Sequence, residues 1–180
     1  MDNRLKAIAL GMQLGVFLDR PQLGFLYDLA LAAPEGIGVE CGVARGSSLM
    51  CWAAARYRRG PIIAVDALVY PLWQYISVHL EKHGPNIVYL NGLSWEVGAM
   101  MADQQRVAFA FIDAGHRKEE ISRDLAVWPK AIMLGGIIAF DDYAEAKWPA
   151  VKPCVDEWQA AAQWEGLGRV GNVIAYRRCT

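Results

Sequence analysis

The sequence has no excess of either charge and few cysteines, and both absences narrow the classes of protein that it can be. It carries 18 Lys and Arg against 19 Asp and Glu, a formal net charge of −1. This balance gives no electrostatic reason to expect a nucleic acid or an anionic membrane as partner. The four cysteines form no C-x-x-C pair and no secreted disulfide framework, so we expect free thiols in the reducing cytoplasm.

Long hydrophobic runs, internal repeats and low-complexity segments are also lacking. The most membrane-like segment, residues 7–18, covers about a dozen residues, too short to cross a bilayer, and we expect a helix there. No linker divides the 180 residues, of which 54% are hydrophobic, enough to fill one core. We therefore expect a single domain over 1–180, with a helical N-terminal region over 1–35 and an α/β core over 36–180.

What the sequence does contain is an alternation of short apolar runs with helix-like segments. The runs are rich in Val, Ile, Ala and Phe and are bounded by Gly, Pro, Asp or Asn, as is typical of strands buried on both faces of a parallel sheet. They are residues 36–42, 61–67, 86–92, 107–115, 135–142 and, last, 170–178. Segments between them, such as 47–59 and 117–134, carry helical periodicity, and the basic cluster at 55–60 is expected to be a solvated helix end. This alternation predicts an open α/β sheet with helices on both faces.

Polar residues end five successive runs. They are Glu40, Asp66, Asn91, Asp113 and the pair Asp141-Asp142. In an open α/β sheet the ligand binds beyond the carboxyl ends of the strands, near the point where the strand order reverses. The sequence therefore predicts a functional site at this edge of the sheet.

Glycines mark the turn that follows the first run. Gly42 and Gly46 let the backbone pass close to a ligand, and Ser47 and Ser48 can cap the next helix. Glycines needed only for packing in a strand-to-helix turn would give the same pattern. The spacing lacks the first close pair of G-x-G-x-x-G and is followed by no Walker lysine, which disfavours NAD, FAD and a phosphate-binding loop.

With Glu40 before these glycines and Asp66 about twenty residues after the turn, the sequence resembles the class I S-adenosylmethionine-dependent methyltransferases. The resemblance implies a doubly wound, Rossmann-like sheet, mostly parallel with an antiparallel strand near the C-terminus and helices on both faces. It also implies S-adenosylmethionine as cofactor, with these binding residues: Glu40, Gly42, Val43, Ala44, Gly46, Ser47, Asp66, Ala67, Gly92, Leu93, Ser94 and Asp113. Leu93 departs from the family, which often has an acid between the glycine and the serine near the adenine.

Three carboxylates are expected to converge at the edge of this cofactor site. Adjacent parallel strands would bring Asp113 beside Asp141 and Asp142, and carboxylates that close together repel unless a cation neutralises them. An all-oxygen set suits Mg²⁺, with Ca²⁺ or Mn²⁺ left open and Zn²⁺ disfavoured. A sheet edge that carries only helix N-caps is the alternative interpretation.

A second resemblance covers roughly residues 36–178 and rests mainly on 111–143 and 148–158. These stretches resemble the metal-dependent small-molecule O-methyltransferases, above all the macrocin O-methyltransferase and cephalosporin-hydroxylase-like group, and more distantly the catechol O-methyltransferases. The resemblance implies that Asp113, Asp141 and Asp142 bind the metal, and that Asp113 and His116 take part in catalysis, with His116 as general base. A helix-start histidine that only caps or contacts solvent is the alternative.

The expected activity is therefore Mg²⁺-assisted O-methylation of a small hydroxylated acceptor, a sugar or a phenolic natural product. The alternatives are a metal-independent methyltransferase, a non-catalytic S-adenosylmethionine-binding module, and a nicotinamide-dependent oxidoreductase. We expect a small-molecule acceptor, no nucleic acid and no membrane as partners, and a cytoplasmic location, with a homo-oligomer left open. Trp95, Tyr143 and Trp148 are further candidates to face the ligands.

Overall fold

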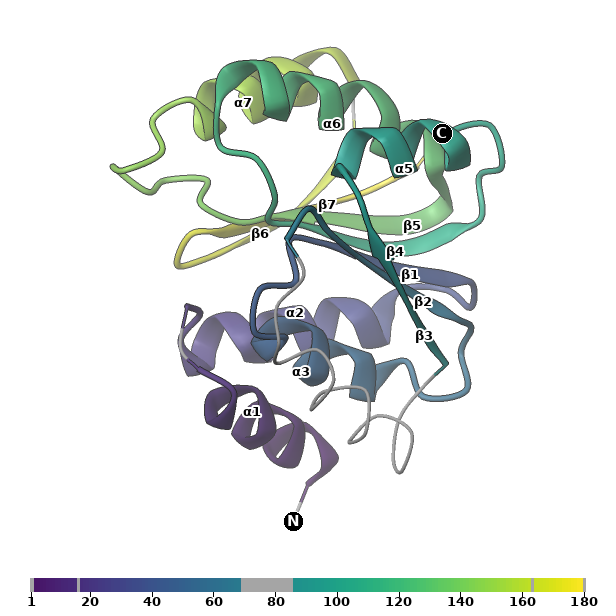
Figure 1. Cartoon of the computed structure of the whole chain (residues 1–180), viewed down its shortest axis with the longest axis vertical. Helices are drawn as coiled ribbons and strands as arrows, with labels where there is room; N and C mark the ends of the chain where they lie inside the picture. The colour runs from purple at the N-terminus through teal and green to yellow at the C-terminus, as the bar shows by residue number, and fades with distance from the viewer. Residues whose placement is uncertain (1, 16, 69–85, 163, 180) are drawn as a thin grey trace.

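The computed structural model describes residues 2–15, 17–68, 86–162 and 164–179, and its centre is a seven-stranded sheet (Figure 1). The strands are β1 (Ile37–Cys41), β2 (Ile62–Asp66), β3 (Ile87–Asn91), β4 (Val107–Ile112), β5 (Ile132–Phe140), β6 (Glu165–Val170) and β7 (Val173–Arg177). Their order in the sheet is β3-β2-β1-β4-β5-β7-β6. The first five strands are parallel, whereas β7 runs antiparallel to both β5 and β6. The predicted Rossmann-like fold is confirmed.

Helices cover both faces of the sheet (Figure 1). They are α1 (Asn3–Gln13), α2 (Arg20–Ala32), α3 (Ser47–Ala55), α5 (Ser94–Met101), α6 (Lys118–Ala131) and α7 (Val151–Ala162). The first three lie on one face, and α5, α6 and α7 lie on the other. The central strands of the parallel part are therefore buried on both sides, which explains why β4 reads as an unbroken apolar run with every residue buried, whereas the edge strand β3 is partly exposed.

The strand order reverses between β1 and β4, and this sets the position of the site. Cys41 at the end of β1 pairs with Val65 of β2 on one side and with Ile112 of β4 on the other. Ile112 in turn pairs with Phe140, the last residue of β5. The residues that follow these four strands consequently emerge at one level of the sheet, as the sequence predicted.

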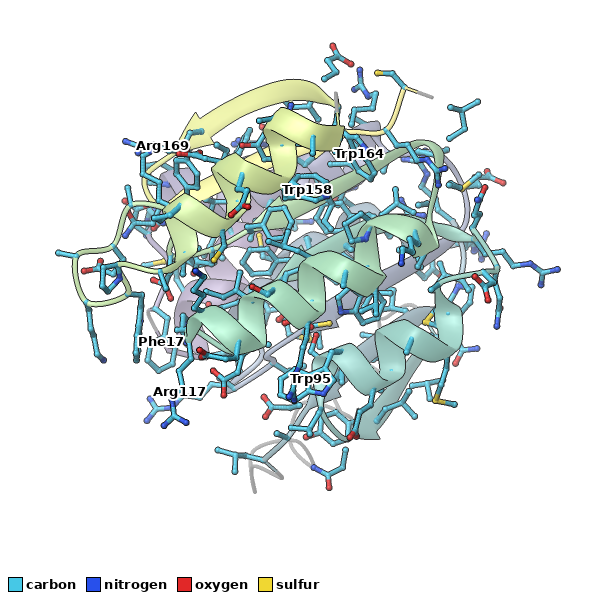
Figure 2. The ribbon with its side chains drawn as sticks, turned by 90° about the horizontal axis from the view of Figure 1, so that it is seen from above. Phe17, Trp95, Arg117, Trp158, Trp164 and Arg169 are labelled. Atoms are coloured by element: carbon cyan, nitrogen blue, oxygen red, sulfur yellow. The ribbon has the colours of Figure 1, made fainter. Side chains whose placement is uncertain are left out.

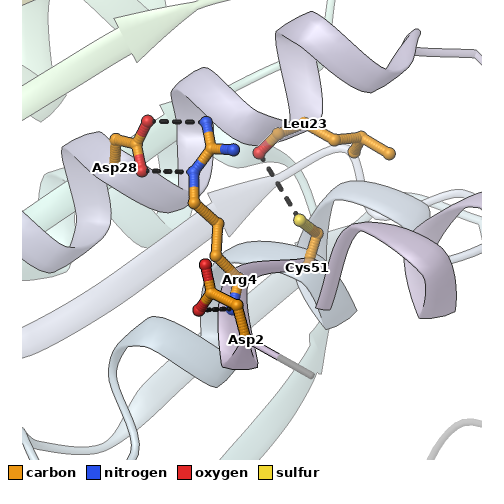
Figure 3. Close-up of polar contacts among 5 residues, drawn as sticks. All are labelled: Asp2, Arg4, Leu23, Asp28 and Cys51. Atoms are coloured by element: carbon orange, nitrogen blue, oxygen red, sulfur yellow. Dashed lines mark hydrogen bonds and ion pairs between the residues drawn. The ribbon is translucent and has the colours of Figure 1, made fainter. Parts of the chain in front are cut away.

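The N-terminal helices are held together by polar contacts as well as by apolar packing (Figure 3). The Arg4 guanidinium on α1 donates two hydrogen bonds of 2.7 Å to the two carboxylate oxygens of Asp28 on α2. The Cys51 thiol on α3 donates to the Leu23 carbonyl oxygen of α2 at 3.4 Å. These contacts place α1 and α2 against α3, the helix that follows the glycine-rich turn.

An aromatic cluster fixes α7 to the C-terminal part of the sheet (Figure 2). Trp158 of α7 makes edge contacts with Phe140 at the end of β5, with Trp164, and with Tyr176 of β7, at ring-centroid distances of 5.6, 5.2 and 5.5 Å. Such tilted contacts add about 0.5–1.5 kcal/mol each to the burial of the rings. This cluster holds the end of β5, and therefore the acidic pair after it, in a fixed place.

Four details differ from the sequence-based prediction. The expected helix over 7–18 begins at Asn3 and ends at Gln13. The helical pattern over 117–134 ends at Ala131, where β5 begins directly, because Pro129 and the β-branched Ile132 favour an end to the helix. Strand β6 was not predicted, since its sequence, Glu-Gly-Leu-Gly-Arg-Val, has no apolar run. Among the described residues, no helix is long and apolar enough to cross a membrane.

The fourth difference is that the basic cluster at 55–60 is not wholly solvated. Arg56 is fully buried, and its guanidinium donates hydrogen bonds to the carbonyl oxygens of Ala30, Pro34 and Gly36, at 3.2, 3.0 and 2.9 Å. These carbonyls lie at the end of α2 and before β1, where the chain has no helix or strand partner for them. Arg56 therefore closes this turn, whereas its neighbour Arg58 is exposed as expected.

Candidate active site

A cavity of about 540 Å³ opens at the carboxyl ends of the parallel strands. Most of the predicted cofactor residues line it: Gly42, Ala44, Asp66, Ala67, Gly92, Leu93, Ser94 and Asp113. The predicted catalytic and metal residues line it as well: Asp113, His116, Asp141 and Asp142. Four predicted cofactor residues lie outside its wall: Glu40, Val43, Gly46 and Ser47. The structure thus brings the two halves of the predicted site, the glycine-rich turn and the acids, to one cavity.

Gly42 is a position of the turn where a side chain cannot be accommodated. Its φ is 87°, and a Cβ atom there would lie 1.7 Å from the Asp113 carbonyl oxygen. Only glycine combines this left-handed backbone with so close an approach. The turn after β1 is therefore pressed against the end of β4, and the cofactor side of the cavity adjoins the acidic side directly.

The first turn of α3 makes contacts that differ from those predicted for its residues. Gly46 is the N-cap of α3 with a φ of 77°, and the Ser47 hydroxyl donates a 2.9 Å hydrogen bond to the Gly11 carbonyl oxygen of α1. Ser47 is buried by this contact. The Ser47 hydroxyl therefore links α3 to α1 and is not part of the cavity wall.

The Asp66 carboxylate organises the glycine-rich turn. Its Oδ2 accepts hydrogen bonds of 2.9 Å from the backbone N–H groups of Val43 and Ala44, and its Oδ1 accepts one of 2.8 Å from the N–H of Leu68. The Ala44 backbone is left-handed, with a φ of 44°, a conformation that two hydrogen bonds to one carboxylate can hold in place. Asp66 also lines the cavity, so the predicted role in cofactor binding remains a prediction that fits its position.

Glu40 lies beneath this turn, with no exposed surface. Its carboxylate accepts a hydrogen bond of 2.8 Å from the Ser48 hydroxyl and another from the Trp52 indole N–H, both on α3. Burial raises the pKa of Glu40 to about 8, although the hydrogen bonds from Trp52 and Ser48 oppose the shift. Glu40 therefore supports the turn from behind, and its predicted direct role in cofactor binding is not tested by this arrangement.

The turn after β3 forms the other wall of the cofactor side. Ser94 begins α5, is buried, and its hydroxyl accepts a 2.8 Å hydrogen bond from the Trp128 indole N–H of α6. Leu93, in place of the family's acid, is part of the cavity wall together with Trp95, whose ring lies under the Arg123 guanidinium at 5.1 Å. This wall offers apolar surface and backbone groups, with no carboxylate at position 93.

Asp113, His116 and Asp142 form a tight cluster on the acidic side of the cavity. One ligand atom from each lies within 4.8 Å of the others. His116 Nε2 is 2.6 Å from Asp142 Oδ2 and 3.7 Å from Asp113 Oδ1. The cluster differs from the predicted trio in that it holds His116 where Asp141 was expected. Asp142 has a φ of 55°, and this turn separates its side chain from that of Asp141.

Asp141 is almost completely buried, with 9% of its surface exposed. Its Oδ1 is inaccessible and has no hydrogen-bond partner among the described residues. Burial and the nearby Asp113 raise the pKa of Asp141 to about 8, and burial likewise raises the pKa of Asp113 to about 6. A buried carboxylate beside two others, all in the wall of one cavity, fits a divalent cation better than it fits a metal-free core.

His116 is fixed by its neighbours on two sides. Its ring stacks on the Trp148 indole, with centroids 4.3 Å apart and an interplanar angle of 16°. Burial lowers the pKa of His116, but Asp113 and Asp142 outweigh that effect and raise it to about 9. Trp148, which the sequence marked as a candidate to face ligands, therefore orients the predicted base. The Lys147 ammonium also lies over the Trp148 ring, with Nζ 4.7 Å from the ring centroid.

The sequence did not identify several residues of the cavity wall. Phe17, Glu120 and Lys147 line it, and Asp124 lies buried behind it on α6. Phe17 comes from the segment between α1 and α2, far in sequence from the strand ends on which the prediction was based. Asp124 has one signal that could have revealed it, since it falls on the same helical face as the apolar Ile121 and Trp128.

Comparison with known proteins identifies the family. Residues 39–143 match the Methyltransf_24 family, described as a methyltransferase domain. The chain belongs to this methyltransferase family. The match spans more than half of the chain and runs from β1 to the residue after the acidic pair, so it includes both halves of the cavity. The predicted class I methyltransferase is thereby confirmed, the protein is an enzyme of that class, and a nicotinamide-dependent oxidoreductase is excluded.

The methyltransferase also resembles individual proteins. A curated relative, an uncharacterized protein of Acanthamoeba polyphaga mimivirus, is 29% identical over 91 residues, which cover 48% of this chain and 41% of that protein. The apo structure of CalS11, a TDP-rhamnose 3'-O-methyltransferase of calicheamicin biosynthesis, has a TM-score of 0.69 with 22% identity, covering 97% of this chain and 92% of that one. The mycinamycin methyltransferase MycE, in complex with Mg, SAH and mycinamycin VI, has a TM-score of 0.67 with 16% identity, covering 99% and 55%. At these identities the two solved structures establish a shared fold.

Proposed function

We propose that the methyltransferase transfers a methyl group from S-adenosylmethionine to a hydroxyl group of a small acceptor with the help of a divalent cation, Mg²⁺ before Ca²⁺ or Mn²⁺. The observation that carries this proposal is the carboxylate–histidine cluster in the wall of the same cavity as the glycine-rich turn. The turn and Asp66 suit a cofactor, the acids suit a hard cation, and His116 suits a proton acceptor. All three lie around one cavity, as a methyl transfer to oxygen requires.

Asp113, Asp141 and Asp142 are the residues that would hold the cation. When bound, a divalent cation supplies Lewis-acid activation of the acceptor hydroxyl. In the metal-free cluster Asp113 and Asp142 keep the pKa of His116 at about 9, so the imidazole is protonated at neutral pH and cannot accept a proton. His116 can act as a base only when those carboxylates are neutralised, which supports metal assistance. The stacked Trp148 ring keeps Nε2 of His116 directed at the acids.

The acceptor we propose is a hydroxylated sugar or phenolic natural product. Aromatic side chains from three separate segments, Phe17, Trp95 and Trp148, line the cavity, and flat rings of this kind pack well on sugar and phenol faces. CalS11 is named as a methyltransferase of a sugar, TDP-rhamnose, and MycE, from the mycinamycin biosynthetic pathway, is in complex with mycinamycin VI, which supports this choice. We further propose one methyltransferase domain over 1–180 and action in the cytoplasm, since all four cysteines are free thiols.

A metal-independent methyltransferase is the second candidate, and one observation favours it. His116 and Asp142 already form a close ion pair of 2.6 Å, so the cluster is partly neutralised without a cation. In that case the acids would position the acceptor and the amino group of the cofactor. The number of acids speaks for the metal, because one imidazolium paired with Asp142 cannot neutralise three carboxylates around the same cavity.

Calorimetric titration with S-adenosylmethionine and then Mg²⁺ tests the proposal. We expect wild type to bind both, and the Asp141→Asn/Asp142→Asn variant to keep the cofactor and lose Mg²⁺. Asp103→Asn, the same change at an exposed acid remote from the cavity, should bind both as wild type does. Cofactor binding without any Mg²⁺ binding by wild type would select the metal-independent candidate, and absence of cofactor binding would overturn the proposed function.

A further inference from the structure

Asp124, in the middle of α6, is a buried carboxylate that the proposed mechanism does not use. Only 2% of its surface is exposed, and both of its carboxylate oxygens are inaccessible. Among the described residues, no group makes a hydrogen bond with either oxygen. A buried acid without a partner costs several kcal/mol, so a native fold keeps one only where something else satisfies it.

A small cavity lies beside Asp124 and shows which groups this carboxylate faces. The cavity has a volume of about 20 Å³ and is lined by Asp124 of α6 and by Asp141 after β5, with apolar walls from Phe140, Val151 and Val155. It also reaches the acidic cluster, since Asp113 and His116 form part of its lining. A single water needs about 10–15 Å³ of such volume and two or more polar partners, so this cavity holds one water and no larger ligand.

Asp141 presents a matching group to the same cavity. Its Oδ1 is the second buried carboxylate oxygen of this region that lacks a partner among the described residues. A carboxylate oxygen can only accept, so two carboxylates cannot satisfy each other while both are ionised. A water has two O–H donors and can give one to each, which solves both problems with one molecule.

On its other side Asp124 adjoins the cofactor half of the site. Ser94 and Trp128 lie close enough to counter, in part, the effect of burial, which raises the pKa of Asp124 to about 6, but neither reaches hydrogen-bonding geometry. The Ser94 hydroxyl is engaged instead by the Trp128 indole. Asp124 thus stands between Ser94, in the cofactor wall, and Asp141, in the acidic wall.

We propose that Asp124 and Asp141 share one buried water in this small cavity, and that Asp124 is a positioning residue for Asp141. The water would hold Oδ1 of Asp141 and leave Oδ2 as the oxygen available to a cation. The positioning part rests on the proposed Mg²⁺-assisted function, whereas the water link does not. Groups that orient a metal ligand in this manner typically change metal affinity by about 10–100-fold when they are removed.

Paired measurements of Mg²⁺ affinity and thermal stability on Asp124→Leu test the positioning role. We expect the Mg²⁺ affinity to fall by about 10–100-fold while the thermal midpoint stays level or rises, because a well-packed apolar side chain replaces an unsatisfied acid. A residue that only holds the fold together would lose stability together with affinity. Asp124→Asn keeps the size of the side chain and a polar group for the water, so a smaller loss is expected, and it serves if the leucine variant fails to fold.

Glu119→Gln is the matched control, since it removes one exposed charge from the same helix. It should bind Mg²⁺ as wild type does. Unchanged Mg²⁺ affinity in a folded Asp124→Leu, or in both Asp124 variants, overturns the positioning role while the proposed function stands. If wild type binds no Mg²⁺, both the metal-assisted function and the positioning role fail.

A high-resolution crystal structure of the metal-free protein decides the water link by itself. The expected result is one water within about 2.6–3.2 Å of a carboxylate oxygen of Asp124 and of Oδ1 of Asp141. A dry cavity, or a direct contact between the two carboxyl groups, overturns the link. This readout separates the two parts of the proposal, because it does not depend on any metal or on turnover.

Discussion

At the scale of single residues, the protein buries carboxyl groups away from the bulk solvent and surrounds each with different neighbours. Glu40 has donors on both of its oxygens, from Ser48 and Trp52, whereas Asp124 has none among the described residues. The hydrogen bonds of Glu40 join the glycine-rich turn to α3. The Asp124 carboxylate still needs a hydrogen-bond donor. Burial raises the pKa of both groups, so their protonation depends on what each one faces.

Glu40 makes the stability of the fold depend on pH. Its pKa rises from 4.5 to about 8 on folding, because burial disfavours the charged form. A carboxyl that holds its proton longer in the folded state stabilises the fold fully below pH 4.5, and this contribution is lost as the pH rises through about 8. We expect the free energy of unfolding of wild type to fall over this range more steeply than that of Glu40→Gln.

Urea unfolding at several pH values measures the difference, and the comparison with Glu40→Gln is essential because Asp113 and Asp141 also have raised pKa values. Glutamine keeps an oxygen for the Trp52 indole and cannot titrate. Parallel pH curves for the two proteins would show that Glu40 is ionised in the folded state and would contradict this prediction.

Which site residues the sequence reveals depends on the element that carries them. Asp113 and the pair Asp141-Asp142 follow apolar strands, and a polar residue after a buried run is a visible contrast. Asp124 sits in a helix that is rich in charged residues, where one more acid looks like part of a solvated face. Arg56 was taken as solvated for the same reason. The burial of both is a result of tertiary packing, which the local sequence records only for Asp124, through its spacing from Ile121 and Trp128 on one helical face.

At the scale of elements, the segment between β5 and α7 carries half of the acidic site and is fastened at several points. The Tyr143 hydroxyl donates to Asp156 of α7 at 2.5 Å, and Lys152 of α7 pairs with the same carboxylate at 2.5 Å. The Tyr143 backbone N–H donates to the Asn172 carbonyl oxygen in the turn between β6 and β7, at 3.0 Å. These contacts hold the left-handed backbone of Asp142 between two neighbouring elements.

Removal of the Tyr143 hydroxyl should therefore loosen the acidic cluster. In Tyr143→Phe we expect a loss of about 1 kcal/mol in stability, as for one partly buried hydrogen bond, and a reduction of several-fold in Mg²⁺ affinity. Chemical unfolding and calorimetric titration measure the two effects. Tyr57→Phe, which removes an exposed hydroxyl far from the cavity, is the control. Full Mg²⁺ affinity in a Tyr143→Phe variant that has lost stability would separate this segment from the metal site.

The elements themselves were largely predictable, and the failures share one physical cause. Strands at the centre of the sheet need continuous apolar sequence, so β1, β2, β4, β5 and β7 were predictable, and the edge strand β3 was predictable because it also keeps an apolar run. Strand β6 lies at the edge of the sheet, pairs only with β7 and is largely exposed, so it needs no apolar run. The boundary between α6 and β5 was missed because Ile132 continues the apolar pattern of the helix across the point where the chain changes from helix to strand. A continuous apolar run, which β3 has and β6 lacks, is what makes a strand predictable from the sequence.

At the scale of the whole molecule, the net charge is only −1, but the charged residues are distributed unevenly over the protein. Acids outnumber bases in the cavity wall, which carries Lys147 and His116 and these acids: Asp66, Asp113, Glu120, Asp141 and Asp142. Carboxylates held this close repel one another, and folding has to bring them together. The same concentration of negative charge would attract a divalent cation and a sulfonium cofactor. Binding of these ligands would then offset the free energy that folding requires to bring the carboxylates together.

Mg²⁺ should consequently stabilise the whole protein. A ligand that binds only the folded state at about 100 times its Kd adds roughly 3 kcal/mol, which for a chain of this size raises the thermal midpoint by about 6–12 °C. We expect this rise in wild type and in Asp103→Asn, and none in Asp141→Asn/Asp142→Asn, in scans at matched ionic strength with NaCl as the reference. The double variant should start from a higher midpoint without metal, because it carries less repulsion. An equal rise in all three proteins would mean that Mg²⁺ acts on the general surface charge, and the acids of this cavity would then have to be assigned to the cofactor and the acceptor alone.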